Sequence, residues 1–177
     1  GVYVYNCKPM QLQALWQQKG KYEQLSIGDK GEQVAFIADL DTTKQRTRPY
    51  ELFYWKEKQK MARSIATMDS PFLPDNWLIS KNARPRFSKD GSKLFFGTAP
   101  TPLLPDTSIL AEDKAVVEVW SYTDPMLYTQ QKVRLNREKR RTYLAAWHIA
   151  PNTFVQLGDK HTPEVSMGDE GNAKVKI

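Results

Sequence analysis

The 177-residue sequence predicts an all-β fold, a partial β-propeller of about three blades with long insertions. Three observations support this prediction. Short runs of aromatic and β-branched residues are bounded by Gly, Pro, Asn or Asp, as strands usually are. A turn with Asp and Gly occurs three times, and the aromatic run at 50–55 recurs at 143–148. Repeated hairpins joined to aromatic strands are typical of propeller blades.

The expected strands are short and follow one another along the whole chain. They lie at residues 1–5, 33–39, 50–56, 93–97, 116–122, 142–150, 153–157 and 174–177. Helical spacing is found only at 10–19, where Gly20 would end a brief helix. Two proline-rich segments, 70–76 and 99–115, predict irregular connections, and the second is long enough to be an insertion.

The repeated turn occurs in three segments, at 25–36, 87–96 and 165–175. Each combines a serine, a turn with Asp and Gly, and a strand that begins two or three residues after the last glycine. Glycine suits the left-handed backbone of such a turn, and an Asp side chain can bond the turn backbone. The residues singled out as the blade-turn motif are Ser26, Gly31, Ser88, Asp90, Gly91, Ser166 and Gly171.

The spacing of the repeats sets the expected size of the propeller. Ser26 and Ser88 are 62 residues apart, and Ser88 and Ser166 are 78 apart. Ordinary blades take about 40–50 residues, so these blades carry insertions and the chain holds about three. Closure takes at least about four blades, and an open stack leaves unpaired edges. We therefore expect residues 1–177 to be a single partial propeller domain from a longer chain. A generic β-sandwich with similar turns is the alternative.

Positive charge is concentrated in one short segment. The chain has 26 Lys and Arg against 20 Asp and Glu, a net charge of +6, and residues 132–141 alone contribute +5. Val133 and Leu135 alternate with polar residues there, which predicts a half-buried strand that leads into a hairpin tip at 136–139. The segment is interpreted either as a solvated tip or as a polyanion-binding patch. Its basic residues are Lys132, Arg134, Arg137, Lys139, Arg140 and Arg141.

Other chemistry finds little support in the sequence. Nucleic-acid binding is disfavoured because basic groups are not spread over a face, and no apolar run is long enough to span a membrane. Cys7 is expected to be a packed thiol. His148 and His161 have no partner at metal-ligand spacing, so no metal or cofactor is expected. The tryptophans of strand patterns are expected in the core rather than in a stacking platform: Trp55, Trp120 and Trp147.

Residues 85–96 read Pro-Arg-Phe-Ser-Lys-Asp-Gly-Ser-Lys-Leu-Phe-Phe. This segment resembles the Phe-Ser-Pro-Asp-Gly-x-x-Leu-x-Phe blade motif of TolB-like propellers and of the amino-terminal propellers of prolyl oligopeptidase-family serine peptidases. Lys89 stands where that motif usually has Pro. Residues 118–134, with 141–144 and 155–159, resemble a bacterial branch of these peptidases, related to dipeptidyl and acylaminoacyl peptidases. The family-like motif within 118–134 consists of Trp120, Asp124, Pro125 and Gln131.

The resemblance implies a function that depends on a second domain. In such peptidases a Ser-Asp-His triad lies in an α/β-hydrolase domain that follows the propeller, with the nucleophile in a Gly-x-Ser-x-Gly turn. The closest segment here, Ala62-Arg63-Ser64-Ile65-Ala66, lacks both glycines. The chain alone is therefore expected to be inactive and to gate the access of peptide substrates to a hydrolase domain of the same parent chain. An exported, periplasmic location is favoured. The alternative is a non-enzymatic TolB-like propeller that serves as a protein-interaction scaffold.

Overall fold

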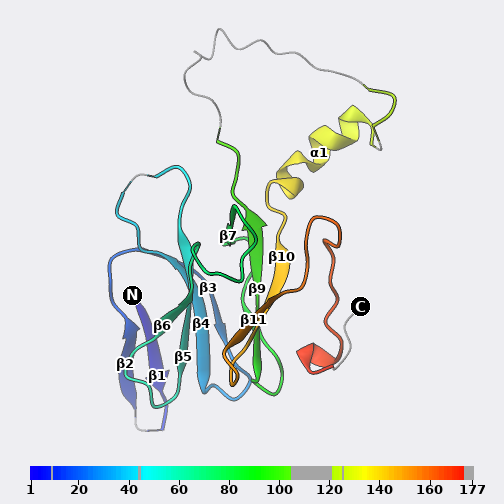
Figure 1. The fold of residues 1–177 in the computed structure, drawn as a ribbon. Coiled ribbons are helices and arrows are strands. Elements are labelled where there is room, and N and C mark those ends of the chain that lie inside the picture. Colours follow the sequence, from blue (N-terminus) through cyan, green and yellow to red (C-terminus); the bar gives the residue numbers. More distant parts are fainter. Residues whose placement is uncertain (9, 44, 105–120, 125, 174–177) are drawn as a thin grey trace. The chain divides into compact units, whose positions relative to one another are not determined.

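The structure, a computed structural model, describes residues 1–8, 10–43, 45–104, 121–124 and 126–173. The chain divides into two compact units. The sheet unit comprises Gly1–Thr101 with Thr142–Ile177, and the helical unit comprises Pro102–Arg141. The sheet unit consists of antiparallel strands, so the predicted all-β class is confirmed (Figure 1).

The first sheet of the sheet unit has four antiparallel strands in chain order. They are β3 (Lys21–Ile27), β4 (Gln33–Asp39), β5 (Tyr50–Lys56) and β6 (Arg63–Ala66). The two central strands, β4 and β5, have the predicted bounds. The outer strands were missed because each is only partly buried and rich in polar residues, so its sequence carries no clear alternation.

The second sheet is built around β9. Its strands are β7 (Trp77–Ile79), β8 (Arg86–Phe87), β9 (Lys93–Pro100), β10 (Tyr143–His148) and β11 (Thr153–Gln156). β7 and β8 pair with successive parts of one edge of β9, and β10 pairs with the other edge, so this sheet is also four strands wide. The predicted repeat of aromatic strands is borne out, because β5 and β10 are each followed by one outer strand.

A two-stranded hairpin, β1 (Val2–Asn6) and β2 (Gln11–Trp16), completes the sheet unit. The helix predicted over 10–19 is therefore wrong. β2 pairs with β1 along its length, and its Leu15 is fully buried against the first sheet. Tertiary packing here overrides a helical spacing that was too short to be decisive.

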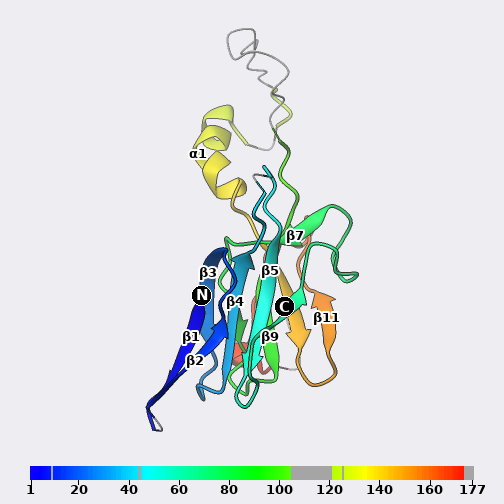
Figure 2. The ribbon, with the colours of Figure 1, turned by 90° about the vertical axis from the view of Figure 1, so that its left-hand side faces the viewer.

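The side chains of β4 alternate between two cores. Val34, Phe36 and Ala38 pack with Val2 and Leu15 of the hairpin. Ala35 and Ile37 belong to the core shared with the second sheet. The first sheet thus lies between the hairpin and the second sheet (Figure 2). Sheets stacked face to face in this way form a partial, propeller-like fold with a four-stranded sheet, a five-stranded sheet and a hairpin.

Connections between the strands follow the prediction in part. Residues 70–76 form turns and bends, as expected. The segment predicted to be irregular from residue 99 begins instead as strand, since Pro100 pairs with Trp77 at the end of β9. Proline is tolerated at such a position because no further ladder donor is needed. The strands predicted at 116–122 and 174–177 lie wholly or mostly outside the described residues, and Tyr122 lies in a turn.

The helical unit contains α1 (Tyr128–Glu138), so the strand and hairpin tip predicted between 132 and 139 are wrong. No side chain of α1 is buried, and Val133 is 83% exposed. The apolar alternation therefore did not mark a half-buried strand. Gln, Lys, Arg and Leu favour helix, and this local preference decides the conformation where no packing competes. In the described part of the chain, no helix has the length and apolar character needed to cross a membrane.

Candidate binding site

Three turns of the sheet unit end in a glycine with a left-handed backbone, although in the third turn Asp169 and Glu170 also have positive φ angles, of 48° and 50°. Their last glycines have positive φ angles of 72°, 70° and 88°, at Gly31, Gly91 and Gly171. The backbone N–H of each glycine donates to the carbonyl three positions earlier, over 2.8, 2.8 and 3.0 Å, on Gly28, Ser88 and Gly168. Only glycine adopts this left-handed conformation without steric cost, which explains why the glycines recur at these positions.

The serines of the three motifs are not equivalent. The Ser88 hydroxyl donates to Asp90 Oδ1 over 2.6 Å and accepts the N–H of Lys93 over 3.0 Å. Ser88 precedes its turn glycine by three positions, whereas Ser26 and Ser166 precede theirs by five. Ser26 is buried at the end of β3, and Ser166 is exposed. Only Ser88 therefore stabilises a turn through its side chain.

Asp90 is held as a carboxylate by this turn. Its oxygens accept the hydroxyl of Ser88, then the N–H and the hydroxyl of Ser92. These hydrogen bonds favour the charged form and lower the pKa of Asp90 from its usual 3.8 to about 2. The carboxylate is thereby committed to the turn, which is a structural role.

The three turns contact one another in series although they are far apart in sequence. Gln33 Nε2 of the first turn donates to the carbonyl of Gly91 over 3.1 Å. Lys93 Nζ, beside the second turn, donates to the carbonyl of Gly171 over 3.0 Å. Lys89 Nζ and Glu170 Oε2 form an ion pair of 2.9 Å between the second and third turns.

Beside these turns lies a cavity of about 660 Å³, which we name the β3–β8 groove. It is bordered by Ser26 and Ile27 of β3, by Arg86 and Phe87 of β8, and by residues 165–167. Two predicted motif residues, Ser26 and Ser166, are thus brought to one groove. The groove could not be predicted from the sequence, because its walls come from segments about 60 and 80 residues apart.

The cations of the groove differ in how they are held. Arg84 Nε donates to the carbonyl of Leu25 over 2.9 Å, which fixes this side chain beside β3. Lys89 is paired with Glu170. Arg86 is exposed and has no acidic partner among the residues that the structure describes. Two guanidinium groups therefore face the groove with donors to spare.

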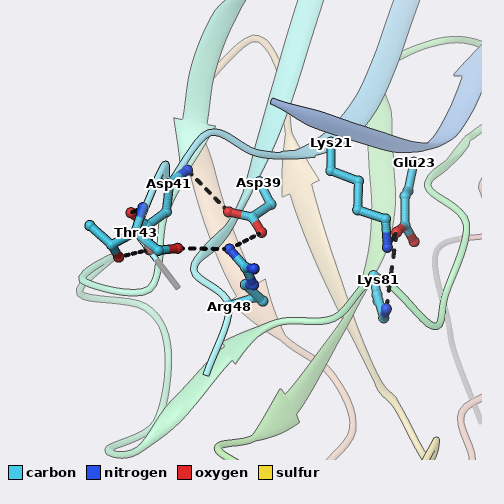
Figure 3. Close-up of polar contacts among 7 residues, drawn as sticks. All are labelled: Lys21, Glu23, Asp39, Asp41, Thr43, Arg48 and Lys81. Atoms are coloured by element: carbon cyan, nitrogen blue, oxygen red, sulfur yellow. Dashed lines mark hydrogen bonds and ion pairs between the residues drawn. The ribbon is translucent and has the colours of Figure 1, made fainter. Parts of the chain in front are cut away.

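A separate polar cluster holds the loop between β4 and β5 (Figure 3). Asp39, only 4% exposed, accepts the N–H of Asp41 over 3.1 Å and lies 3.5 Å from Arg48 Nη1. The same Nη1 donates to the carbonyl of Thr43 over 3.0 Å. A buried carboxylate needs such partners, so this pair fastens both ends of the loop.

Neighbouring charges in Figure 3 connect β3 with the end of β7. Glu23 Oε1 lies 2.6 Å from Lys21 Nζ and 4.0 Å from Lys81 Nζ. Lys81 Nζ also lies 5.6 Å from the ring centroid of Tyr50. The carboxylate of Glu23 thus links the first sheet to the segment that follows β7.

The basic residues of 132–141 come together on α1 and the turn after it. Lys132, Arg134 and Arg137 lie on the helix, and all of residues 131–140 are exposed. Arg141 instead makes two bonds of 2.6 Å to the Glu138 carboxylate. These bonds, and the charges of Arg141 and its neighbours, lower the pKa of Glu138. The predicted Asp124 and Gln131 contact each other, over 3.4 Å, whereas Trp120 and Pro125 lie outside the described residues.

Catalytic chemistry is not apparent in the described part of the chain. No group of three His, Cys, Asp or Glu side chains there could hold a metal ion. Ser64, in the segment closest to a nucleophile turn, lies on β6 and donates to Glu51 of β5 over 2.7 Å. Cys7 is exposed, so the expected packing of its thiol is wrong. Trp55 and Trp147 are buried in the core, as predicted.

Two comparisons of the sequence find no match. No protein-family model matches the sequence. A search of curated proteins likewise finds no match. Inferences about function therefore depend on the geometry of the described residues and on the motif resemblance.

Proposed function

We propose that this chain is the propeller portion of a prolyl oligopeptidase-like serine peptidase. Its role would be to cap the active-site chamber and gate peptide access to a hydrolase domain elsewhere in the parent chain. One observation carries the proposal. Residues 85–96, which resemble the blade motif of that family, form β8, the Gly91 turn and the first part of β9, a hairpin of the second sheet.

The packing of the sheet unit supports a gating scaffold. The two sheets bury a shared core between them, and the turns of the motif contact one another in series. This arrangement leaves β3 of the first sheet and β8 of the second sheet beside the β3–β8 groove. A wall of stacked sheets with a groove along one edge suits the guidance of extended peptides.

Covalent labelling of serine nucleophiles tests the proposal. The 177-residue chain and the full-length product of its gene would be treated with a fluorophosphonate reagent and digested. We expect the full-length protein to be labelled at a serine within Gly-x-Ser-x-Gly, outside residues 1–177, and the short chain to remain unlabelled. Full-length protein should also hydrolyse aminoacyl-proline or acyl-amino-acid substrates, and the label should abolish this activity.

Two results would overturn the proposal. One is serine-reagent-sensitive hydrolysis by the 177-residue chain itself. The other is a full-length product that has no hydrolase domain and takes no label. The second result would favour a TolB-like propeller that acts as a protein-interaction scaffold, because residues 85–96 resemble the blade motif of both groups.

A further inference from the structure

We propose that the β3–β8 groove binds the carboxy-terminal end of an extended peptide, with Arg86 and Arg84 holding its free carboxylate. This inference deepens the proposed function, on which it rests only in treating the peptide as a substrate or product. The binding itself requires no hydrolase domain.

Unpaired backbone borders the groove on both sides. β3 pairs only with β4, and β8 pairs only with β9, so each strand has an edge with no neighbouring strand among the described residues. Residues 163–167 belong to no helix or strand, and within the described ranges their backbone bonds to no other backbone group. Edges of this kind accept an extended peptide through main-chain hydrogen bonds.

The charge of the groove selects an anionic ligand. Arg84, Arg86 and Lys89 outnumber the two acids of the lining, Asp29 and Glu170. Lys89 and Glu170 neutralise each other over 2.9 Å. Among the residues that the structure describes, Arg84 is bonded only through Nε, to the carbonyl of Leu25, and Arg86 has no ion pair, so both guanidinium groups have donors available. A guanidinium fork matches the two oxygens of a carboxylate.

Apolar side chains beside the arginines favour a peptide whose last residue has an apolar side chain. Ile27 is 54% exposed, and Phe87 and Met167 are half-buried, all three on the groove wall. An apolar last side chain of the peptide would cover this surface and remove it from water. The ligand class is therefore a peptide with a free carboxy terminus and an apolar last residue.

Fluorescence anisotropy on the 177-residue chain tests the site directly. The ligands are fluorescein-labelled Gly-Ala-Ala-Leu with a free carboxy terminus and the same peptide as its amide. We expect the acid to bind about tenfold more tightly than the amide, the size expected for a charge-assisted hydrogen bond. Arg86→Gln should weaken acid binding to the level of the amide, and Arg86→Lys should give an intermediate affinity.

A matched arginine provides the control. Arg137→Gln removes another exposed guanidinium, from α1 in the helical unit, and should leave acid binding unchanged. Far-ultraviolet circular dichroism would check that each variant is folded. N-acetyl-leucine, a carboxylate without an extended main chain, should compete only at much higher concentration.

Four outcomes would overturn the inference. They are absence of binding by the unmodified chain, equal affinity for acid and amide, equal losses in Arg86→Gln and Arg137→Gln, and competition by N-acetyl-leucine equal to that of the peptide. Failure here with a labelled serine in the full-length protein would remove the site but leave the peptidase proposal. Peptide binding by the groove with no labelled serine in the full-length protein would support the site and remove the peptidase proposal.

Discussion

Gly171 lies directly against the ring of Phe95. A Cβ atom placed on Gly171 would be 2.6 Å from Phe95 Cε2 and 3.3 Å from Ser88 Cβ, too close for an ordinary contact. Gly31 has the same left-handed backbone, with a φ of 72° against 88°, but nothing lies within 4 Å of its Cβ position. The two glycines therefore separate the cost of backbone conformation from the cost of packing.

Gly171→Ala should destabilise the protein more than Gly31→Ala does. At Gly31 only the left-handed backbone is strained, at about 1 kcal/mol. At Gly171 the new methyl group also presses on Phe95, which adds about 1–3 kcal/mol. Urea unfolding of both variants would measure the difference. Equal losses of stability in the two variants would contradict the close contact between Gly171, in the third turn, and Phe95 of β9.

Tyr54→Phe is expected to raise stability. The Tyr54 hydroxyl is buried in the core and has no hydrogen-bond partner among the described residues, and burial raises its pKa. Removing an unsatisfied buried hydroxyl should gain about 1 kcal/mol. Thermal unfolding would detect the gain as a higher melting temperature. A loss of stability would show that the hydroxyl does have a partner.

Trp147→Phe is the contrasting substitution in the same core. Trp147 packs edge-on against Tyr54 with centroids 4.9 Å apart, and its Nε1–H donates to Asn152 Oδ1 over 3.1 Å. The smaller ring would lose this bond and leave a cavity, at a cost of about 2–3 kcal/mol. Chemical unfolding of the variant would measure this loss in the free energy of unfolding. Because a Phe side chain still fills most of the space of Trp147, Trp147→Phe should lower the free energy of unfolding by less than Tyr54→Ala does.

Asp90→Asn should change the pH dependence of stability. Because the pKa of Asp90 falls from 3.8 to about 2 on folding, its carboxylate stabilises the protein above about pH 4. That contribution should be lost as the pH falls from 4 to 2. Asp90 is exposed, so we expect about 1 kcal/mol at pH 7 after solvent screening. Unfolding free energies of both proteins from pH 7 to 2 should converge at the acidic end, and a constant difference would contradict the prediction.

Asp39 and Arg48 should show measurable coupling. Arg48→Met leaves the buried carboxylate of Asp39 without its cation, although the Arg48 side chain is 41% exposed and water screens the pair. A double-mutant cycle with Asp39→Asn should therefore give about 1 kcal/mol. Lys21→Met, which removes the exposed partner of Glu23, is the control and should cost clearly less than Arg48→Met. Equal effects would rule out a special role for the Asp39–Arg48 pair.

The basic residues of α1 and its following turn predict salt-sensitive retention on heparin. Neutralising phosphate or sulfate groups releases counterions, so retention should fall steeply with salt. Serine substitutions at all six basic positions should move elution to lower salt: Lys132, Arg134, Arg137, Lys139, Arg140 and Arg141. Unchanged elution would eliminate the polyanion-binding interpretation.

Strands that the sequence marked most clearly are those buried on both faces. β4 and β5 lie at the centre of the first sheet, and their continuous apolar runs reflect contacts on both sides. β8, with only two residues, and the polar strand β3 carry no comparable pattern. Their conformation depends on pairing with β9 and β4, which is set by distant parts of the chain.

The sequence by itself determined the all-β class, the central strands and the glycine turns. Each of these follows from local chemistry, because apolar runs and left-handed backbone are properties of a few adjacent residues. Tertiary structure alone decided that 10–19 contains a strand and that Ser26 and Arg86 face one groove. It also placed Gly171 against Phe95. These features arise from contacts between segments far apart in the chain, where packing outweighs local preference.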